Sequence, residues 1–275
     1  MLEKNKVIMG DCLVEMQKIP DKSIDMILCD LPYGTTACKW DTIIPFEPLW
    51  EQYKRIIKDN GAIVLTASQP FTTDLINSQR ELFKYELIWN KENGRQPYLA
   101  KIQPIKSHEN IVVFSKGKIK YNPIMRLAKK ENMRERIKNN FKGVESGVWG
   151  KMKEYTPTKD EKLRYPVSVL NFNMQNAECN QKFRVHPTQK PVALFEYLIK
   201  TYTDENALVL DNTAGSGTTA IACLKTNRQF IVMEKEQKYY DIILKRVGDF
   251  NKNFEPQTLF KINIVTGKQI GRAHV

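Results

Sequence analysis

Four consecutive residues, Asp-Leu-Pro-Tyr at positions 30–33, combine groups that can hold a flat ring bearing an amine. The apolar run at 26–29 is typical of a buried strand, and Pro32 and Gly34 end that strand. At the strand's carboxyl end, the Asp30 carboxylate can accept a hydrogen bond from the amine, and Tyr33 can stack on the ring. An ordinary strand-to-turn connection would use the same residues, so both interpretations stay open.

A glycine-rich turn in the last third of the chain has the layout of a nucleoside-cofactor site. A predicted strand at 207–211 leads into Asn-Thr-Ala-Gly-Ser-Gly-Thr-Thr at 212–219, which precedes a helix and a strand ending in Glu234. Gly215 and Gly217 would let the backbone approach a ligand, and Glu234, 19 positions after Gly215, could hold ribose hydroxyls. The alternative is a connector that only packs the helix on the strand.

The residue types at this turn favour S-adenosylmethionine over a nicotinamide dinucleotide. A dinucleotide site usually carries three glycines before a helix N-terminus, and the third is missing here. Asp211, at the end of the preceding strand, suits a ligand with positive charge, such as an ammonium or sulfonium group. A nicotinamide oxidoreductase is the competing hypothesis.

The net charge of +12 indicates an anionic partner, and the excess lies in the middle of the chain. Residues 115–185 contain 17 Lys/Arg and 7 Asp/Glu, against 26 and 24 in the remainder. Aromatic residues alternate with these basic ones, as in surfaces that touch phosphates and stack on bases. A solvated face, or a small core beneath a polar skin, would have the same composition. The interleaved aromatic residues are Tyr121, Phe141, Trp149, Tyr155, Tyr165, Phe172 and Phe183.

Cysteine and histidine usage predicts neither a disulfide framework nor a metal site. The five cysteines are scattered, the three histidines are far apart, and no CxxC spacing occurs. No run of about eighteen apolar residues is present and the first residues lack a secretory core, so we expect a soluble, cytoplasmic protein without membrane contact.

Strand and helix patterns alternate along the chain, which predicts an α/β fold with a mostly parallel sheet covered by helices. Strands are expected at 6–9, 23–29, 62–67, 85–89, 111–114, 207–211 and 230–234, and helices at 12–19, 49–57, 71–77, 192–199 and 220–224. Asp59-Asn60-Gly61 is expected to stop a helix. A charged helix is expected at 129–142. Residues past about 249 fit no motif, and the end of the chain has the composition of a loose or vector-derived tail.

Taken together, these segments resemble the beta group of amino-methylating DNA methyltransferases. Residues 30–33 look like the family's (D/N/S)PPY motif, 211–219 like its cofactor motif, and 186–191 (His-Pro-Thr-Gln-Lys-Pro) like the segment before it. Gly10-Asp11 is similar to its acidic motif. The order of motifs is that of the beta group, and the match covers about 6–114 and 186–247. Leu31 departs from the usual Pro, and Asn212-Thr213 from the usual Pro-Phe.

The resemblance implies a Rossmann-like fold and a domain plan. Residues 1–114 and 186–249 would form the catalytic domain, 115–185 an inserted basic target-recognition region, and 250–275 a tail. The implied substrate is double-stranded DNA, and a homodimer is compatible with this class. No cysteine has the Pro-Cys context of a carbon-5 nucleophile; Cys29 is predicted to lie in the core.

The resemblance also implies roles for residues. Asp30, the Leu31 carbonyl, Pro32 and Tyr33 would hold the amine of a flipped base. The implied cofactor residues are Asp11, Lys190, Asp211, Gly215, Ser216, Gly217, Thr218 and Glu234. Lys190 would reach the methionine carboxylate unless it is a surface lysine, and His186 could simply set a turn.

Asp at the first motif position favours adenine N6 as the methyl acceptor. Cytosine N4 is the alternative. A DNA-binding protein of the same fold without turnover is a second one, and the residues do not exclude RNA as substrate.

Overall fold

The computed structural model describes residues 3–36, 38, 41–94, 97–127, 145–146, 150–151, 162–173, 189–253 and 263–265. The helix predicted at 129–142, His186 and the end of the tail lie outside these residues, as do Phe141, Trp149, Tyr155 and Phe183. The chain divides into two compact units, one of residues 1–122 and 168–275 and one of residues 123–167.

The larger unit is built on a nine-stranded sheet with the order β10-β4-β5-β3-β2-β11-β12-β1-β13. Within this sheet only β5 runs antiparallel to its neighbours, so the predicted mostly parallel α/β sheet is confirmed. Its strands are β1 Lys6–Met9, β2 Ile24–Asp30, β3 Ile57–Ala67, β4 Phe83–Asn90, β5 His108–Phe114, β10 Val169–Asn171, β11 Leu208–Asp211, β12 Gln229–Glu234 and β13 Asn263–Val265.

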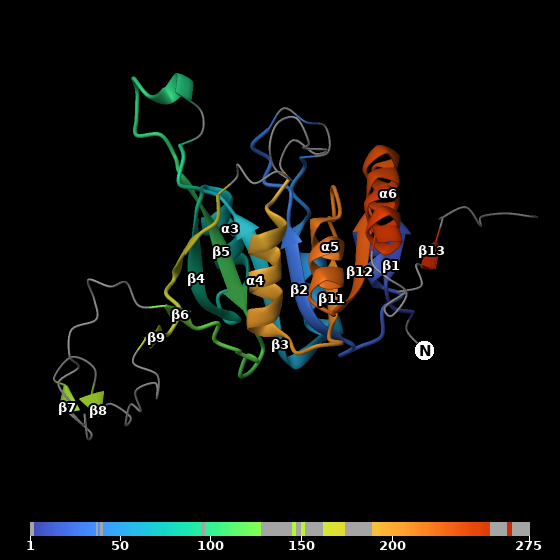
Figure 1. Ribbon diagram of the computed structural model, residues 1–275, viewed down its shortest axis with the longest axis horizontal. Helices are drawn as coiled ribbons and strands as arrows, with labels where there is room; N and C mark the ends of the chain where they lie inside the picture. The colour runs from blue at the N-terminus through green and yellow to red at the C-terminus, as the bar shows by residue number, and fades with distance from the viewer. Residues whose placement is uncertain are drawn as a thin grey trace, which may run out of the picture. The chain divides into compact units, whose positions relative to one another are not determined.

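Helices cover both faces of the sheet (Figure 1), because the strands alternate buried side chains between two apolar clusters. Met26 and Leu28 of β2 belong to the cluster under the last three helices, whereas Ile27 and Cys29 face the first three. Cys29 is fully buried, as predicted. The helices are α1 Cys12–Met16, α2 Phe46–Ile56, α3 Phe71–Ser78, α4 Val192–Tyr202, α5 Thr218–Lys225 and α6 Gln237–Asn253, with a short 3-10 helix η1 at Pro97–Leu99.

Two expectations about element ends are wrong. Residues 59–61 lie inside β3 and do not stop α2, which already ends at Ile56. Gly61 is needed there because a Cβ would stand 2.8 Å from the Asp25 carbonyl oxygen, where the register of β2 and β3 shifts. The tail expected from residue 250 does not begin there, because α6 continues to Asn253. This helix packs on the same face of the sheet as α4 and α5.

The second unit is smaller than the inserted segment predicted at 115–185. Residues 169–171 form β10, which pairs with β4, and the Asn122 N–H donates to the Thr201 carbonyl at 2.7 Å, so both ends of the segment belong to the larger unit. Within the second unit, β6 (Arg126–Leu127) pairs with β9 (Leu163–Arg164), and β7 (Glu145–Ser146) pairs with β8 (Gly150–Lys151). Target recognition by this unit stays a prediction.

Neither a membrane-spanning helix nor a cluster of metal-ligating side chains occurs within the described ranges. No helix there is both long and apolar enough to cross a membrane. No group of three or more His, Cys, Asp or Glu side chains there could hold a metal ion.

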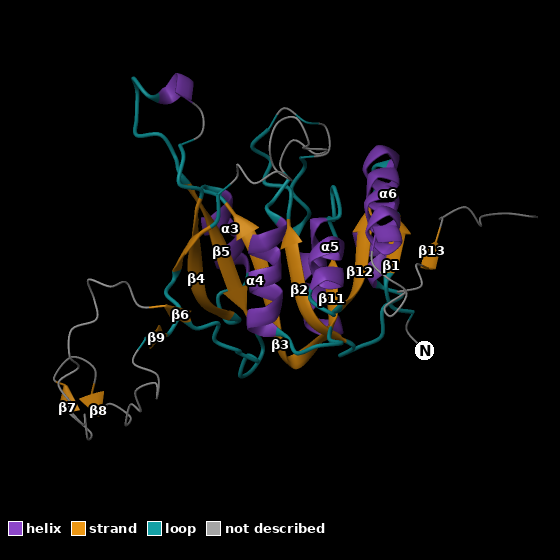
Figure 2. Cartoon of the chain, viewed as in Figure 1, coloured by secondary structure: helices purple, strands orange, loops and turns teal. Residues whose placement is uncertain are grey.

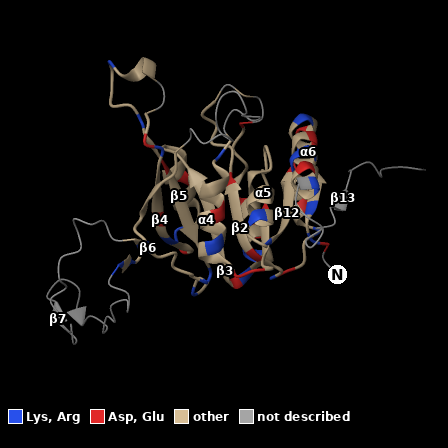
Figure 3. Cartoon of the chain, in the orientation of Figure 1, with Lys and Arg blue, Asp and Glu red and all other residues tan. Residues whose placement is uncertain are grey.

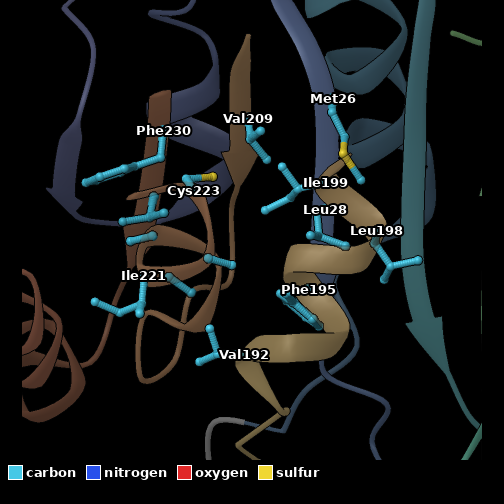
Figure 4. Packing of buried hydrophobic residues seen from close by; sticks show 14 of the residues in the cluster. Met26, Leu28, Val192, Phe195, Leu198, Ile199, Val209, Ile221, Cys223 and Phe230 are labelled. Carbon is cyan, nitrogen blue, oxygen red and sulfur yellow. The ribbon is translucent and has the colours of Figure 1, made fainter. Parts of the chain in front are cut away.

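Helix α4 is the main apolar contact on one face of the sheet, and Leu198 at its centre is fully buried (Figure 4). We expect Leu198→Ala to lower the free energy of unfolding by about 2–5 kcal/mol, because truncation leaves a cavity between α4 and the strands. Denaturant unfolding measures the change. Val14→Ala, at a position 53% exposed on α1, is the control and should change stability by less than about 0.5 kcal/mol.

Candidate active site

The site lies where the parallel strands end. Because β1, β2, β11 and β12 run in the same direction, Asp30, Asp211 and Glu234 at their carboxyl ends reach one edge of the sheet, the upper edge in Figure 1. A cavity of about 500 Å³ opens there. It is lined by every residue predicted for catalysis or cofactor binding except Gly217: Asp11, Asp30, Leu31, Pro32, Tyr33, Lys190, Asp211, Gly215, Ser216, Thr218 and Glu234.

The Asp30 carboxylate is held by three donors. The Tyr33 hydroxyl donates to Oδ1 at 2.8 Å, and the Thr66 hydroxyl donates to the same oxygen at 2.5 Å. Lys190 Nζ donates to Oδ2 at 2.5 Å. These bonds fix the orientation of the carboxylate and leave it lone pairs for a further donor from the cavity.

The Tyr33 ring is packed beside the Asp30 carboxylate. It stacks on Phe71, with ring centroids 5.1 Å apart and planes 27° apart. Burial and then the charge of Asp30 raise the pKa of Tyr33, so its hydroxyl stays protonated and keeps donating to Asp30. A rigid aromatic wall beside a fixed carboxylate is the arrangement expected of a pocket for a flat amine-bearing ring.

Lys190 is almost fully buried, so it is not a surface lysine. Besides Asp30, its ammonium lies 3.5 Å from Glu109 Oε2, and Glu109 also pairs with Lys91. Burial alone would lower the pKa of Lys190, but Asp30 and Glu109 reverse that effect and raise it. Burial likewise opposes ionisation of Glu109, and Lys190 and Lys91 overcome it and lower its pKa. The end of the cavity at Asp30 therefore carries a chain of alternating charges.

Three members of this network were not predicted from the sequence: Thr66, Lys91 and Glu109. Thr66 lies near the end of β3, which pairs with β2, Lys91 follows the last residue of β4, and Glu109 lies near the start of β5. A polar residue next to an apolar run is the signal that could have found them. The contact of Lys190 with the methionine carboxylate of a cofactor stays a prediction.

The Glu234 side chain, at the end of β12, is hydrogen-bonded to the backbone of the glycine turn. Its Oε2 accepts the Gly215 N–H at 2.8 Å, and its Oε1 accepts the Glu236 N–H at 2.9 Å. Burial raises its pKa, and these backbone donors oppose that effect. Gly217, with a φ of 77°, starts α5 in the left-handed region instead of lining the cavity. Asp11 also lines the cavity while its carboxylate caps α1 at the Leu13 N–H, 2.9 Å away.

Asp211 has a structural environment that the sequence did not predict. Its Oδ1 accepts the Thr213 N–H at 3.0 Å and its Oδ2 accepts the Thr219 hydroxyl at 2.5 Å. Burial raises the pKa of Asp211 to about 7. Near neutral pH this carboxyl is thus only partly ionised, which weakens the expectation that it attracts a cation.

Asn212 and Thr213, which stand where the family usually has Pro-Phe, connect the two halves of the site. The Thr213 hydroxyl donates to the Asp30 carbonyl at 3.1 Å, linking the glycine turn to the end of β2. Beneath it, the Asn212 amide oxygen accepts the Tyr53 hydroxyl at 2.5 Å and the Cys29 thiol at 2.9 Å. Pro-Phe at these positions could not make either set of bonds.

The residues around the turn fit S-adenosylmethionine. The Glu234 oxygens retain lone pairs after accepting two N–H groups, as a ribose diol requires, and the exposed glycine backbone allows close approach. The cavity volume is within the range of about 300–1,000 Å³ typical of small-molecule sites.

This combination of parallel sheet, glycine turn and terminal acid is typical of a nucleoside-cofactor enzyme, and Asp30 and Tyr33 line the same cavity. The family model described as "DNA methylase" matches residues 24–245, and the chain belongs to this family. It is an enzyme of the S-adenosylmethionine-dependent DNA methyltransferases, and its fold is Rossmann-like.

Relatives and solved structures agree with this assignment. The Type II methyltransferase M.HinfI of Haemophilus influenzae is 26% identical, over 94% of this chain and 73% of its own length. The DNA adenine methyltransferase YhdJ of Escherichia coli strain K12 is 27% identical, over 94% of this chain and 88% of its own length. The crystal structure of an M1.HpyAVI–SAM complex shares the fold with a TM-score of 0.57, at 23% identity over 88% of this chain and 98% of that one.

The pKa of Asp211 leads to a pH-dependent prediction for the cofactor-free protein. The Asp211 carboxyl has a pKa of 3.8 in the unfolded chain and of about 7 in the folded protein. Between these two values the folded protein keeps the proton and the unfolded chain loses it, so the protonated carboxyl stabilises the fold. This contribution to stability is lost as the pH rises through about 7. Asp211→Asn does not titrate. Its stability relative to wild type should therefore rise by on the order of 3 kcal/mol between about pH 4 and pH 8.

Denaturant unfolding of both proteins across that pH range measures the difference. Parallel stability profiles for the variant and the wild type would show that Asp211 has an ordinary pKa.

Proposed function

We propose that this enzyme methylates the N6 amino group of adenine in specific sequences of double-stranded DNA. The observation that carries the proposal is that Asp30 and Tyr33 share one cavity with Gly215 and Glu234. Asp at position 30 favours adenine over cytosine N4, and the relative YhdJ is named a DNA adenine methyltransferase.

The residues at the end of β2 would activate the amine by position. The lone pair of an exocyclic amine is delocalised into its ring, which makes the amine a poor nucleophile. The Asp30 carboxylate and the Leu31 carbonyl would hold the hydrogens of the amine. The nitrogen is then drawn toward tetrahedral geometry, and its lone pair points at the methyl group of the cofactor. Pro32 keeps the turn rigid and Tyr33 stacks on the ring.

The bound cofactor would supply an electrophilic methyl group on a sulfonium. The amine nitrogen, oriented by the Asp30 carboxylate and the Leu31 carbonyl, would take this methyl group, the cofactor would leave as a neutral thioether, and the amine would release one proton to solvent. Lys190 and Thr66 keep Asp30 in place during this displacement. Neither a metal nor a covalent enzyme adduct is required.

The cofactor roles are assigned to residues that line the cavity. Glu234 would hold the ribose and Asp11 the adenine edge. The turn of Gly215, Ser216 and Thr218 would surround the methionine part, with Asp211 beneath it as a support. The cytoplasmic location and the homodimer expected from the sequence belong to this proposal, and sedimentation of the purified chain tests the second.

The base identity is tested by nucleoside analysis. DNA from cells expressing the chain, digested and analysed by mass spectrometry, should contain N6-methyladenine at one recognition sequence. N4-methylcytosine in its place would reassign the acceptor, and the absence of either methylated base would contradict the proposal. Sequencing that detects modified bases gives the recognition sequence.

Asp30→Ala tests the catalytic assignment. We expect methyl transfer to fall by at least about a thousandfold, because the variant no longer holds the amine, whereas cofactor affinity stays within a few-fold. The Glu109 carboxylate remains beside the buried Lys190 in this variant, so its ammonium keeps a counter-charge. Calorimetry measures cofactor binding, and retained turnover would refute the role of Asp30.

A further inference from the structure

The connection between β4 and β5 leaves the sheet at the rim of the catalytic cavity. Trp89 and Lys91, where the connection begins, and Glu109, where it ends, line that cavity. The Lys91 N–H donates to the Ser107 carbonyl at 2.8 Å and closes the base of the connection. Figure 2 shows the described residues of this connection, 92–94 and 97–107, here named the rim loop, standing away from the sheet with η1 near the outer end.

The outer part of the rim loop has a defined turn that presents large apolar side chains to solvent. The Ile102 N–H donates to the Leu99 carbonyl at 2.8 Å, and the Ala100 N–H donates to the Pro97 carbonyl at 3.1 Å. Ile102 is 78% exposed and Tyr98 is 72% exposed, and only Leu127 of the described large apolar residues, at 75%, has comparable exposure. Folding alone does not explain two such exposed residues, four positions apart, on one hydrogen-bonded turn.

The surroundings of the tip fit a nucleic acid. Lys101 lies beside the two apolar residues and is exposed, and Lys106 stands lower in the loop, where it donates to Ser68 Oγ of the cavity wall at 2.5 Å. In Figure 3 the described part of this loop includes positions coloured as Lys or Arg. The tip is thus an apolar projection with basic residues near it in the chain, on a loop between Lys91 and Glu109, which both line the cavity.

A base that enters this cavity must leave the duplex and its stacked neighbours. The vacated space is apolar on two sides, and a flat or branched side chain can fill it, which lowers the cost of unstacking. Tyr98 and Ile102 have the required character, and they belong to the loop whose two ends border the cavity. A second copy of the chain would be the competing occupant of an exposed apolar tip.

We propose that the rim loop is a wedge that enters the DNA duplex beside the target base, with Tyr98 and Ile102 occupying the space that the flipped base leaves. This inference rests on the proposed function, because it requires duplex DNA as the substrate. Lys101 and Lys106 contact the adjacent phosphates.

The test compares Tyr98→Ala/Ile102→Ala with wild type on two duplexes carrying the recognition sequence. One duplex is fully paired, and the other has a mismatch opposite the target base, which is already easy to extrude. We expect kcat/KM to fall by about tenfold to a hundredfold on the paired duplex and by less than about threefold on the mismatched one. Tyr98→Phe, which keeps the ring, should stay close to wild type, as should the exposed control Val14→Ala.

A second readout does not depend on turnover. With 2-aminopurine at the target position, wild type without cofactor should raise the fluorescence as the base leaves the stack, and the double variant should not. Equal losses on both duplexes, or no loss on either, would overturn the wedge. So would a change of oligomeric state in the double variant, which would assign the tip to a subunit contact. If wild type methylates neither duplex, the proposed function itself fails, and the wedge fails with it.

Discussion

The site depends on one carboxylate being held at the boundary between two binding pockets. Asp30 ends β2, and its side chain accepts bonds from Tyr33, Thr66 and Lys190, so it cannot rotate away from the cavity. Its backbone carbonyl accepts the hydroxyl of Thr213, which belongs to the glycine turn. Asp30 therefore connects the end of β2 to the glycine turn, which fixes where its carboxylate stands relative to that turn.

Charge balance makes this arrangement tolerable inside the protein. A buried carboxylate or ammonium is costly unless a partner of opposite charge lies close to it. Lys190 lies between Asp30 and Glu109, and Lys91 completes the series, so each buried charge has an opposite neighbour. Lys190 and Glu109 each have two partners of opposite charge, so removal of one partner still leaves each of them a second one.

Much of the fold and of the site could be predicted because the relevant signals are local. Apolar runs ending in Asp30, Asp211 and Glu234 marked strands and their polar ends, and a parallel sheet brings such ends to one edge. What was missed depends on pairing between distant segments. Glu109 reaches the site only because β5 runs antiparallel beside β3. Similarly, β10 lies within the predicted inserted segment but pairs with β4 of the larger unit. The high pKa of Asp211 depends on burial, which spacing does not give.

In this mechanism the cofactor and the Asp30 carboxylate meet at one edge of the sheet. A crystal structure of the chain with sinefungin tests this arrangement most directly, because this analogue carries an amine where S-adenosylmethionine carries its methyl group. The expected density has the ribose on Glu234, the methionine part over the turn at Gly215, and the analogue's amine facing Asp30 across the amine-binding pocket. An analogue bound away from the end of β2, or facing away from Asp30 so that no acceptor nitrogen could bridge the gap, would contradict the mechanism.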